Sequence, residues 1–505
     1  MRNRTSARLA FTLRTAVMLL TAVSSLFWAR ALIRVMGNEL YGLFLTFIAI
    51  AQLGGLGDLG ISGAVGMRIL HHLARGEDSD GQRLLANARG VFLALALTFA
   101  VTFVVLSPWL PAFFHFATVP RAGSLGMLFA LGGLGIGLVI INGYFQSLNY
   151  AHGNVVWPIL PSFIFMQAGF VLQWALARVG APLWMQYGAG LGVSGCSVVL
   201  AWAMLRASHP WLGRLRPVRV NWVEARHLAG TSFWVYLCAL GNLIYTTTDQ
   251  ILVNAGFGSS LVPAYRFNYK LPEFAVTLLV SASFVTLPAI VLRLLNGDES
   301  QRGHGLSGVD RLQKLEVFGA CAASIGYLGI NDSFIGLWQG AEFHVPLALQ
   351  VAFALNLTVT IAGNTGVQLL GRLDPKAVRI AGLTIGGTGL LNLGLSFCAM
   401  KFGSLLGIAI ATVIAQTVAT LVMGHSVCRL LRLPWLPWVW RSWLLPVGAL
   451  ALAVLLRAVV APTDGANALI LASADAALLG GLAWTLGITR QMIVDEGRRF
   501  LAASR

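Results

Sequence analysis

The sequence predicts an all-α polytopic membrane protein with about fourteen transmembrane helices. We expect two six-helix lobes around a central cavity, with two further helices at the C-terminal end. Of the 505 residues, 57% are hydrophobic and only 11% are charged, and the mean hydropathy is +0.75. Because a soluble domain carries about 25% charged residues, this chain has too little polar surface to face water. A lipid bilayer fits this composition, since each crossing needs about 20 apolar residues.

Fourteen apolar segments are long enough to form the crossings. A basic N-terminus precedes the first of them, which continues to about Ile33 without the small-residue pattern of a signal-peptide cleavage site. We therefore predict a first helix that is retained. The segments span residues 15–35, 41–66, 87–107, 123–147, 155–177, 183–205, 228–254, 263–292, 315–338, 345–370, 378–400, 403–428, 442–461 and 466–488.

The basic residues alternate between the two sides of the predicted membrane. If the N-terminus lies inside, the inner ends and loops hold 27 of the 35 Lys and Arg residues, and the outer ones hold 6. Cytoplasmic loops of membrane proteins are enriched in Lys and Arg, so this split predicts that both termini are cytoplasmic. It also supports the count of fourteen, because a missed helix would invert every later loop. The same bias accounts for the net charge of +16 without nucleic acid as a partner.

The longest inner loops lie near residues 206–227 and 293–314. The first of these separates six helices from eight. We therefore predict an N-terminal lobe over residues 1–215, a C-terminal lobe over residues 216–432, and a last part over residues 433–505 that holds helices 13 and 14 and a cytoplasmic tail. Many transporters are built from repeated halves of this kind.

Motifs for soluble cofactor chemistry are missing or misplaced. The sequence holds no GxxxxGK[ST] phosphate loop and no HExxH motif, and its five cysteines are isolated from one another. The run from Gly55 to Gly60 matches GxGxxG, but it lies in an apolar segment, where small residues let helices pack closely. We predict no cofactor, no metal site and no catalytic residues. The longest outer loop, near residues 107–123, leaves little room for a membrane enzyme's active site.

Four apolar segments carry polar side chains at steps of three or four residues, which places them on one face of each helix. Polar and ionisable groups are expensive inside a bilayer, so they indicate function. We predict that these faces line a shared water-filled cavity. The polar faces comprise Asn142, Gln146 and Asn149; Asn242, Thr246 and Asp249; Arg266, Lys270, Glu273, Thr277 and Ser281; and Asn356, Thr360, Asn364 and Gln368.

Charged groups of three segments are expected at similar depth in the outer half of the membrane. They are Arg30, Asp249, Arg266, Lys270 and Glu273, and their net charge is +1. A net cationic pocket attracts anionic substrates such as phosphates or acidic sugars. Two alternatives stay open: the charges pair with one another only to hold the bundle together, and the amides hydrogen-bond between helices.

Asp58, in the second segment, is a separate case. Its carboxylate either binds a proton or cation, or forms a local cap or ion pair near the inner side.

Two stretches of the chain resemble a known family. The first is Ala31-Leu-Ile-Arg-Val-Met-Gly-Asn-Glu-Leu-Tyr-Gly-Leu43, followed by Gly57-Asp-Leu-Gly-Ile61 and Arg68. The second is Gly241-Asn-Leu-Ile-Tyr-Thr-Thr-Thr-Asp-Gln-Ile-Leu-Val253, followed by Ala264-Tyr265 and Lys270-Leu-Pro-Glu273. These runs resemble bacterial polysaccharide flippases of the multidrug/oligosaccharidyl-lipid/polysaccharide exporter superfamily.

The resemblance implies a V-shaped bundle of two six-helix lobes around a central, often cationic cavity. It implies movement of a sugar head group, carried on undecaprenyl diphosphate, from the inner to the outer leaflet of the bacterial cytoplasmic (inner) membrane. By similarity, the residues near that cavity are Arg30, Asp58, Asp249, Arg266, Lys270 and Glu273.

We therefore predict an O-antigen or exopolysaccharide flippase that works by alternating access. Expected partners are the lipid-linked oligosaccharide, membrane lipid, and polysaccharide polymerase and chain-length proteins. Coupling to H⁺ or Na⁺ is expected through Asp58 or Asp249. The predicted substrate-binding residues are Arg30, Arg266, Lys270, Asp249, Glu273, Asn242, Asn142 and Gln146.

Three other functions remain open. A cation-coupled multidrug antiporter of the same superfamily would need an acidic cavity for cationic drugs. A lipid II flippase would differ from the first prediction only in its substrate. A membrane polysaccharide ligase or polymerase would need larger outer loops than this sequence has.

Overall fold

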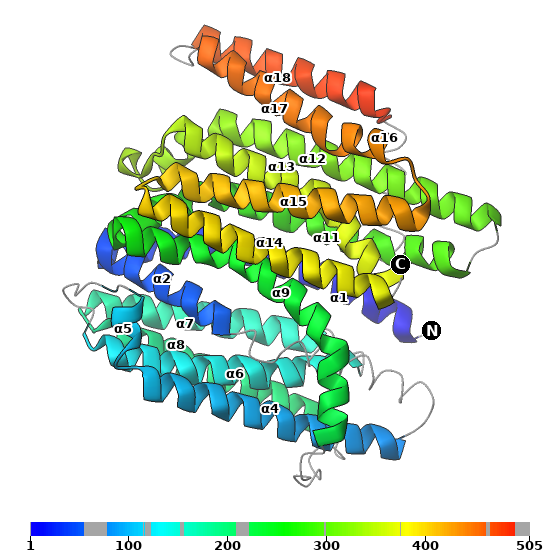
Figure 1. Cartoon of the computed structure of the whole chain (residues 1–505). Coiled ribbons are helices and arrows are strands. Elements are labelled where there is room, and N and C mark those ends of the chain that lie inside the picture. The colour runs from blue at the N-terminus through cyan, green and yellow to red at the C-terminus, as the bar shows by residue number, and fades with distance from the viewer. Residues whose placement is uncertain are drawn as a thin grey trace. The chain divides into compact units, whose positions relative to one another are not determined.

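The computed structural model describes residues 2–54, 78–114, 116, 123–151, 156–208, 222–296, 299–373, 375–460 and 465–489. Within these ranges the chain forms helices joined by short connections, without strands, which confirms the predicted all-α class (Figure 1). Nine of the described helices are long and apolar enough to cross a membrane. Each of the fourteen predicted segments contains a described helix, while the number of crossings remains a prediction.

The chain divides into two compact units, Met1–Pro263 and Ala264–Arg505. In the first unit, α4 packs on α6, α6 on α8, α8 on α7 and α7 on α1, and α2 packs on α6 and α9. The helices of this unit are α1 (Arg2–Met36), α2 (Asn38–Gly54), α4 (Asp78–Leu106), α5 (Leu110–Phe113), α6 (Leu125–Ala151), α7 (Val156–Arg178), α8 (Leu183–Ser208), α9 (Trp222–Phe257) and the 3₁₀ turn η3 (Ser259–Leu261).

In the second unit, α13 is central and packs against α11, α12, α14 and α15. The helix α12 also contacts α17 and α18. The elements of this unit are α10 (Val262–Asn268, which begins just before the boundary), α11 (Lys270–Asn296), α12 (Glu299–Trp338), η4 (Ala341–Phe343), α13 (Leu347–Leu373), α14 (Pro375–Lys401), α15 (Leu405–Leu431), α16 (Trp435–Val439), the π turn η5 (Trp440–Leu444), α17 (Leu445–Val459) and α18 (Gly465–Leu486).

The helix α12 is longer than the sequence predicts. Residues 293–314 were expected to form an inner loop, yet α11 continues to Asn296 and α12 already begins at Glu299. The added turns are amphipathic, because they bury Val309 and Leu312 and pair Lys314 with Asp310 at 2.6 Å, four residues apart. At 40 residues, α12 is about 60 Å long, more than a bilayer core requires.

The predicted eighth segment is two helices, α10 and α11, separated at Tyr269. Pro272 lies in the first turn of α11, where its missing N–H costs no helical hydrogen bond. The fully buried Asn268 secures the break: its Nδ2 donates to the carbonyl oxygens of Ala264 and Phe343, each at 2.8 Å, and its Oδ1 accepts from Asn331.

The first family-like run forms the junction between α1 and α2. Gly37 has a φ of +79°, a conformation open to glycine, and it turns the chain between the two helices. Gly42, one turn into α2, lies directly against η3: a Cβ placed there would lie 1.8 Å from the carbonyl oxygen of Ser259. Both glycines of this run are therefore required by local geometry.

The last two helices are held by a buried ion pair. The guanidinium of Arg457 on α17 meets the carboxylate of Asp475 on α18 with two hydrogen bonds of 3.1 and 2.5 Å, and it also reaches the carbonyl oxygen of Ile325 on α12 at 3.3 Å. The two side chains are only 7% and 17% exposed. Bidentate pairing of this kind fixes both distance and orientation, so it joins α17 and α18 to α12.

Replacing Gly42 with Ala should destabilise the protein by about 1–3 kcal/mol, since the new methyl group meets backbone that cannot move independently. The melting temperature of the purified protein measures the effect. Gly192→Ala is the control, because nothing lies within 4 Å of a Cβ at that position. Equal melting temperatures for the two variants would contradict the packing of α2 against η3.

Replacing Asp475 with Asn should cost about 3–5 kcal/mol, because it leaves the buried Arg457 without its counter-charge. The double variant Arg457→Leu, Asp475→Leu should recover most of that loss. Thermal unfolding measures all three proteins. The matched control is Asp310→Asn, which breaks a more exposed pair and should cost less than about 1 kcal/mol; a comparable loss there would argue against the special role of the α17–α18 pair.

Candidate functional site

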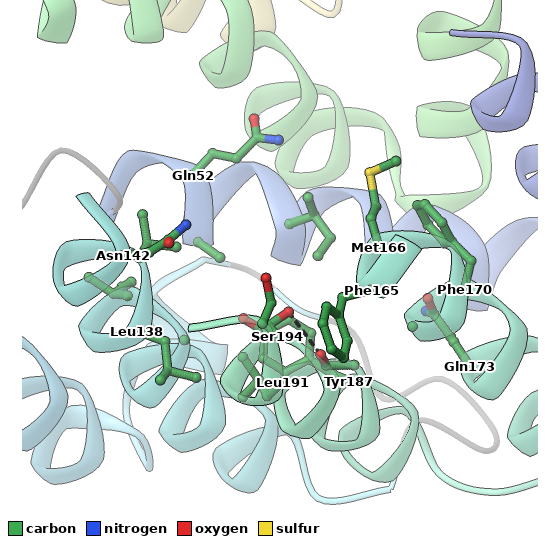
Figure 2. A pocket seen from close by; sticks show the side chains of 18 of the residues that line it. Gln52, Leu138, Asn142, Phe165, Met166, Phe170, Gln173, Tyr187, Leu191 and Ser194 are labelled. Carbon is green, nitrogen blue, oxygen red and sulfur yellow. Dashed lines mark hydrogen bonds between the residues drawn. The ribbon is translucent and has the colours of Figure 1, made fainter. Parts of the chain in front are cut away.

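The first unit encloses a cavity of about 680 Å³ between α2, α6, α7 and α8, with Leu243 of α9 at its edge (Figure 2). Pockets of about 300–1,000 Å³ are the usual size for small-molecule sites. Glycines on the facing helices leave this space open, since Gly169 on α7 and Gly190 on α8 face one another without side chains.

The described lining of this cavity is mostly apolar, with uncharged polar side chains among it. Aromatic and aliphatic side chains, among them Phe44, Phe165 and Phe170, cover most of the wall. The hydrogen-bonding side chains are Gln52, Asn142, Ser162, Gln173, Gln186, Tyr187, Ser194 and Ser197. None of the described lining residues carries a formal charge. This combination suits a ligand that has apolar faces and some hydroxyl or amide groups.

Two glutamines of the cavity have hydrogen-bonding atoms that the described residues leave unused. Gln173 is 6% exposed and its Nε2 has no partner. Gln186 is 1% exposed; its Nε2 donates to the carbonyl oxygen of Ala181 at 2.9 Å, while its Oε1 has no partner. Buried polar atoms are nearly always paired, so a donor and an acceptor without a partner among the described residues are unusual features of this wall.

A third glutamine on the same helix as Gln173 is fully used. Gln167 accepts from the indole of Trp28 at 2.8 Å and donates to Ser24 at 3.0 Å, so it ties α7 to α1. The Trp28 ring also stacks on Phe170 with 5.8 Å between centroids. The two glutamines therefore differ: Gln167 joins two helices, whereas Gln173 lies in the cavity wall with an amide nitrogen that has no partner among the described residues.

The second unit holds a small group of charges at the start of α11. Glu273 accepts a hydrogen bond from Arg266 at 2.6 Å through one carboxylate oxygen and from Lys270 at 3.1 Å through the other. All three side chains are partly exposed, and their net charge is +1. Further along the same face, the Thr277 and Ser281 hydroxyls each donate to the carbonyl oxygen four residues earlier, so this stripe needs no partner helix.

The predicted residues are distributed over both units. The structure brings Arg266, Lys270 and Glu273 together in the second unit, and it places Asn142 on the wall of the cavity in the first. On α9, Asn242 is exposed whereas Asp249 is buried, although the two share a predicted face. Asn142, Asn242 and Asp249 therefore lie in three different surroundings, namely the cavity wall, an exposed position and a buried one.

Three further predicted residues complete the set. Arg30 is half-buried on α1, and its buried Nε has no hydrogen-bond partner among the described residues. Asp58 and the side chain of Gln146 lie outside the described residues.

Gln173, Gln186 and Tyr187 were not among the residues predicted from the sequence. Each was visible as an amide or phenol within an otherwise apolar segment, at 155–177 or 183–205. They form no i, i+4 stripe, because the cavity takes one or two residues from each of several helices. Periodicity on one helix therefore could not identify them.

No family model matches this chain, and no curated protein matches it. Several solved structures do match this chain. A lipid II flippase, MurJ, in an inward closed conformation has 15% sequence identity and a TM-score of 0.66, and the match covers 94% of this chain and 98% of that one.

Multidrug transporters of the MATE family match as well. A mutant of the Vibrio cholerae MATE transporter VcmN gives 14% identity and a TM-score of 0.58, over 86% of this chain and 98% of that one. An inward-facing multidrug resistance MATE family transporter of the MOP superfamily gives 15% and 0.54, over 85% and 95%. At these identities the likeness establishes the fold: this is a multi-pass membrane protein with the two-lobed architecture of these flippases and transporters.

Gln173→Leu should leave the melting temperature unchanged or raise it, because it removes a buried donor without a protein partner, a feature that costs about 1–3 kcal/mol. Gln167→Leu should lower the melting temperature, since Trp28 and Ser24 lose their partner. Thermal unfolding of the two purified variants, which carry the same substitution six residues apart on α7, makes the comparison. If Gln173→Leu is the less stable of the two, the amide has a structural role.

Proposed function

We propose that this chain is a flippase that moves an oligosaccharide linked to undecaprenyl diphosphate across the bacterial cytoplasmic membrane by alternating access. The observation that carries the proposal is the cavity of the first unit, whose described lining combines apolar and aromatic side chains with uncharged amides and hydroxyls. The product would serve O-antigen or exopolysaccharide synthesis. The likeness to MurJ supports a flippase, since that protein is named for moving lipid II.

The cavity chemistry fits a sugar. Sugar hydroxyls both donate and accept hydrogen bonds, as the amides of Gln173 and Gln186 do, and the two glutamines leave one donor and one acceptor unused. Flat aromatic side chains such as Phe165 and Tyr187 offer apolar faces for the C–H side of a sugar ring. A volume of about 680 Å³ accommodates a head group of a few sugar rings.

The anionic part of the substrate needs cations, which the charge group of the second unit supplies. Arg266 and Lys270 both contact the carboxylate of Glu273, and this group of three side chains carries a net charge of +1. Guanidinium and ammonium groups are the usual partners of phosphate oxygens. We assign the diphosphate to Arg266 and Lys270, with Glu273 holding both side chains in place. Arg30, Asn242 and Asp249 remain proposed contacts of the same substrate.

The orientation and partners follow from the sequence. Both termini are proposed to be cytoplasmic on the ground of the Lys and Arg distribution. Polymerase and chain-length proteins are the proposed partners, because a flipped oligosaccharide is next joined to others. An ion gradient acting through Asp58 or Asp249 is the proposed energy source, as no nucleotide-binding motif is present in the sequence.

A multidrug antiporter is the second candidate, favoured by the likeness to the MATE transporters. Cationic drugs need an acidic site, whereas none of the described residues that line the first unit's cavity is charged. The charge group of the second unit is net positive. Both features support an anionic, sugar-bearing substrate over a cationic drug.

Arg266→Ala combined with Lys270→Ala should lower surface polysaccharide roughly 10- to 100-fold, the size expected for loss of charge-assisted hydrogen bonds worth about 1.5–3 kcal/mol. The variants are expressed in a strain that lacks its own flippase, and surface polysaccharide is quantified. The control is Lys314→Ala, which breaks another ion pair of the same unit. Normal polysaccharide from the double variant would rule out these cations as substrate contacts.

Two further readouts separate the alternatives. A deletion strain that becomes sensitive to cationic drugs while keeping its surface polysaccharide would favour the antiporter. A gene that is essential for growth would favour lipid II as the substrate.

A further inference from the structure

Glu316, near the middle of α12, is a buried carboxylate with neutral partners only. It is 4% exposed, and among the described residues only Asp249 is also both charged and buried. One carboxylate oxygen accepts from Asn364 Nδ2 at 2.8 Å and from the Ser283 hydroxyl, and the other accepts from the Thr365 hydroxyl. The three helices α11, α12 and α13 therefore meet at this one side chain.

The other acids of the second unit are held differently. Glu273 contacts Arg266 and Lys270, and Asp475 lies against Arg457. The side chain of Asp475 is 17% exposed and receives a bidentate guanidinium, so this fold supplies a cation even to a carboxylate that is less buried than Glu316. For Glu316 the described residues supply none within 4 Å.

The charged groups on the elements around Glu316 pair with one another or lie toward the surface, apart from the half-buried Arg311. On α17 and α18, Arg457 pairs with Asp475; on α12 itself, Lys314 pairs with Asp310, which Arg441 of η5 also approaches at 3.6 Å. The remaining ones are Lys270 and Glu273, which pair with each other, and the exposed Arg293 on α11; the exposed Glu299, Arg302, His304 and Asp332 and the half-buried Arg311 on α12; and Glu342 on η4. The charge on α13 is Arg372, whose side chain lies outside the described residues.

The hydrogen bonds at this site are complete with or without a proton on the carboxylate. When Glu316 is charged, Ser283 donates to it. When Glu316 is protonated, its own O–H can donate to the Ser283 oxygen, and the Ser283 hydroxyl can turn to the carbonyl oxygen of Leu279, 3.2 Å away. Asn364 and Thr365 keep their roles in both states. One hydroxyl rotation therefore lets the site take up or release a proton without an unpaired group.

Polar groups lie near this carboxylate in two directions. A cavity of about 310 Å³ is lined by Asp310, Lys314 and Gln313, and Gln313 precedes Glu316 by three residues on the same face of α12. Gln313 donates to Ser442 at 2.6 Å within this wall. Polar side chains thus extend from the cavity to within one helical turn of Glu316.

On the other side, polar groups follow α13. Asn364 touches Glu316, Thr360 one turn earlier donates to Asn356 at 3.1 Å, and Asn356 donates to the Tyr269 hydroxyl at 3.4 Å. Asn356 and Asn364 are about 12 Å apart along the helix. Glu316 therefore lies between a polar cavity and a polar file that ends beside the Arg266–Lys270–Glu273 group.

We infer that Glu316 is a proton-binding site of the second unit, which takes up a proton as a carboxylic acid and releases it as a carboxylate. The atoms that surround it are arranged as donors, with the amide nitrogen of Asn364 rather than its oxygen toward the carboxylate. That arrangement suits a carboxyl group, whereas a sodium ion would need several oxygens directed at one point. The assignment is independent of the nature of the transported substrate.

The test is an infrared pH titration of the purified full chain in lipid nanodiscs. The wild type should show the carbonyl stretch of a protonated carboxylic acid that disappears as the pH rises, and Glu316→Gln should lack that band. Glu273→Gln is the matched control and should keep it, because Glu273 is ion-paired. The same band in Glu316→Gln, or no titrating band in the wild type, would overturn the inference.

The same spectra also test for sodium binding, and a second variant is available if Glu316→Gln does not fold. Adding Na⁺ at fixed pH should leave the band in place. Loss of the band with Na⁺ and not with K⁺ would show a sodium site and overturn the proton assignment.

If Glu316→Gln does not fold, the variant Thr365→Val replaces it. In this variant the band should disappear at higher pH than in the wild type, because the carboxylate has lost a hydrogen-bond donor. An unchanged midpoint of the infrared titration would count against the site. These spectra need no transport, so they hold even where polysaccharide export fails.

Discussion

A polar group inside an apolar medium must find a partner, and most features of this protein follow from how each group finds one. Water is absent from the hydrocarbon layer, so an unpaired donor, acceptor or charge is expensive there. Arg457 and Asp475 meet this demand with each other, Gln167 with Trp28 and Ser24, and Asn268 with two backbone carbonyls. These closed sets fix helices to one another, and nothing in them is left for a ligand.

Other groups keep some hydrogen-bonding or charge capacity, and the proposed function is placed there. Among the described residues, Gln173 and Gln186 each have one atom without a partner beside the first unit's cavity. Glu316 is satisfied in two protonation states rather than in one. The group of Arg266, Lys270 and Glu273 carries a net charge of +1. The proposed transport needs features of this kind, because a site that the protein satisfied completely would bind nothing, and a site fixed in one state could not cycle.

The two units divide the chemistry between them. The described wall of the first unit's cavity combines apolar and aromatic side chains with uncharged amides and hydroxyls. The second unit holds the Arg266, Lys270 and Glu273 group and the buried carboxylate of Glu316. The proposed substrate, a sugar carried on a diphosphate, has chemical groups of both kinds. The polar face of α13, which the sequence assigned to a water-filled cavity, instead pairs with neighbouring helices through Asn356 and Asn364.

The sequence by itself determined the membrane class, the positions of the helices and the presence of polar stripes, because these depend on composition and on the fixed periodicity of a helix. It also identified Arg266, Lys270 and Glu273, which are neighbours along one stretch of chain. Only the tertiary structure decided which amides are spent on packing and which face a cavity, as Gln167 and Gln173 show on a single helix. It alone joined Ser283, Glu316 and Asn364, which are far apart in the chain, since a partner on another helix leaves no trace in local spacing.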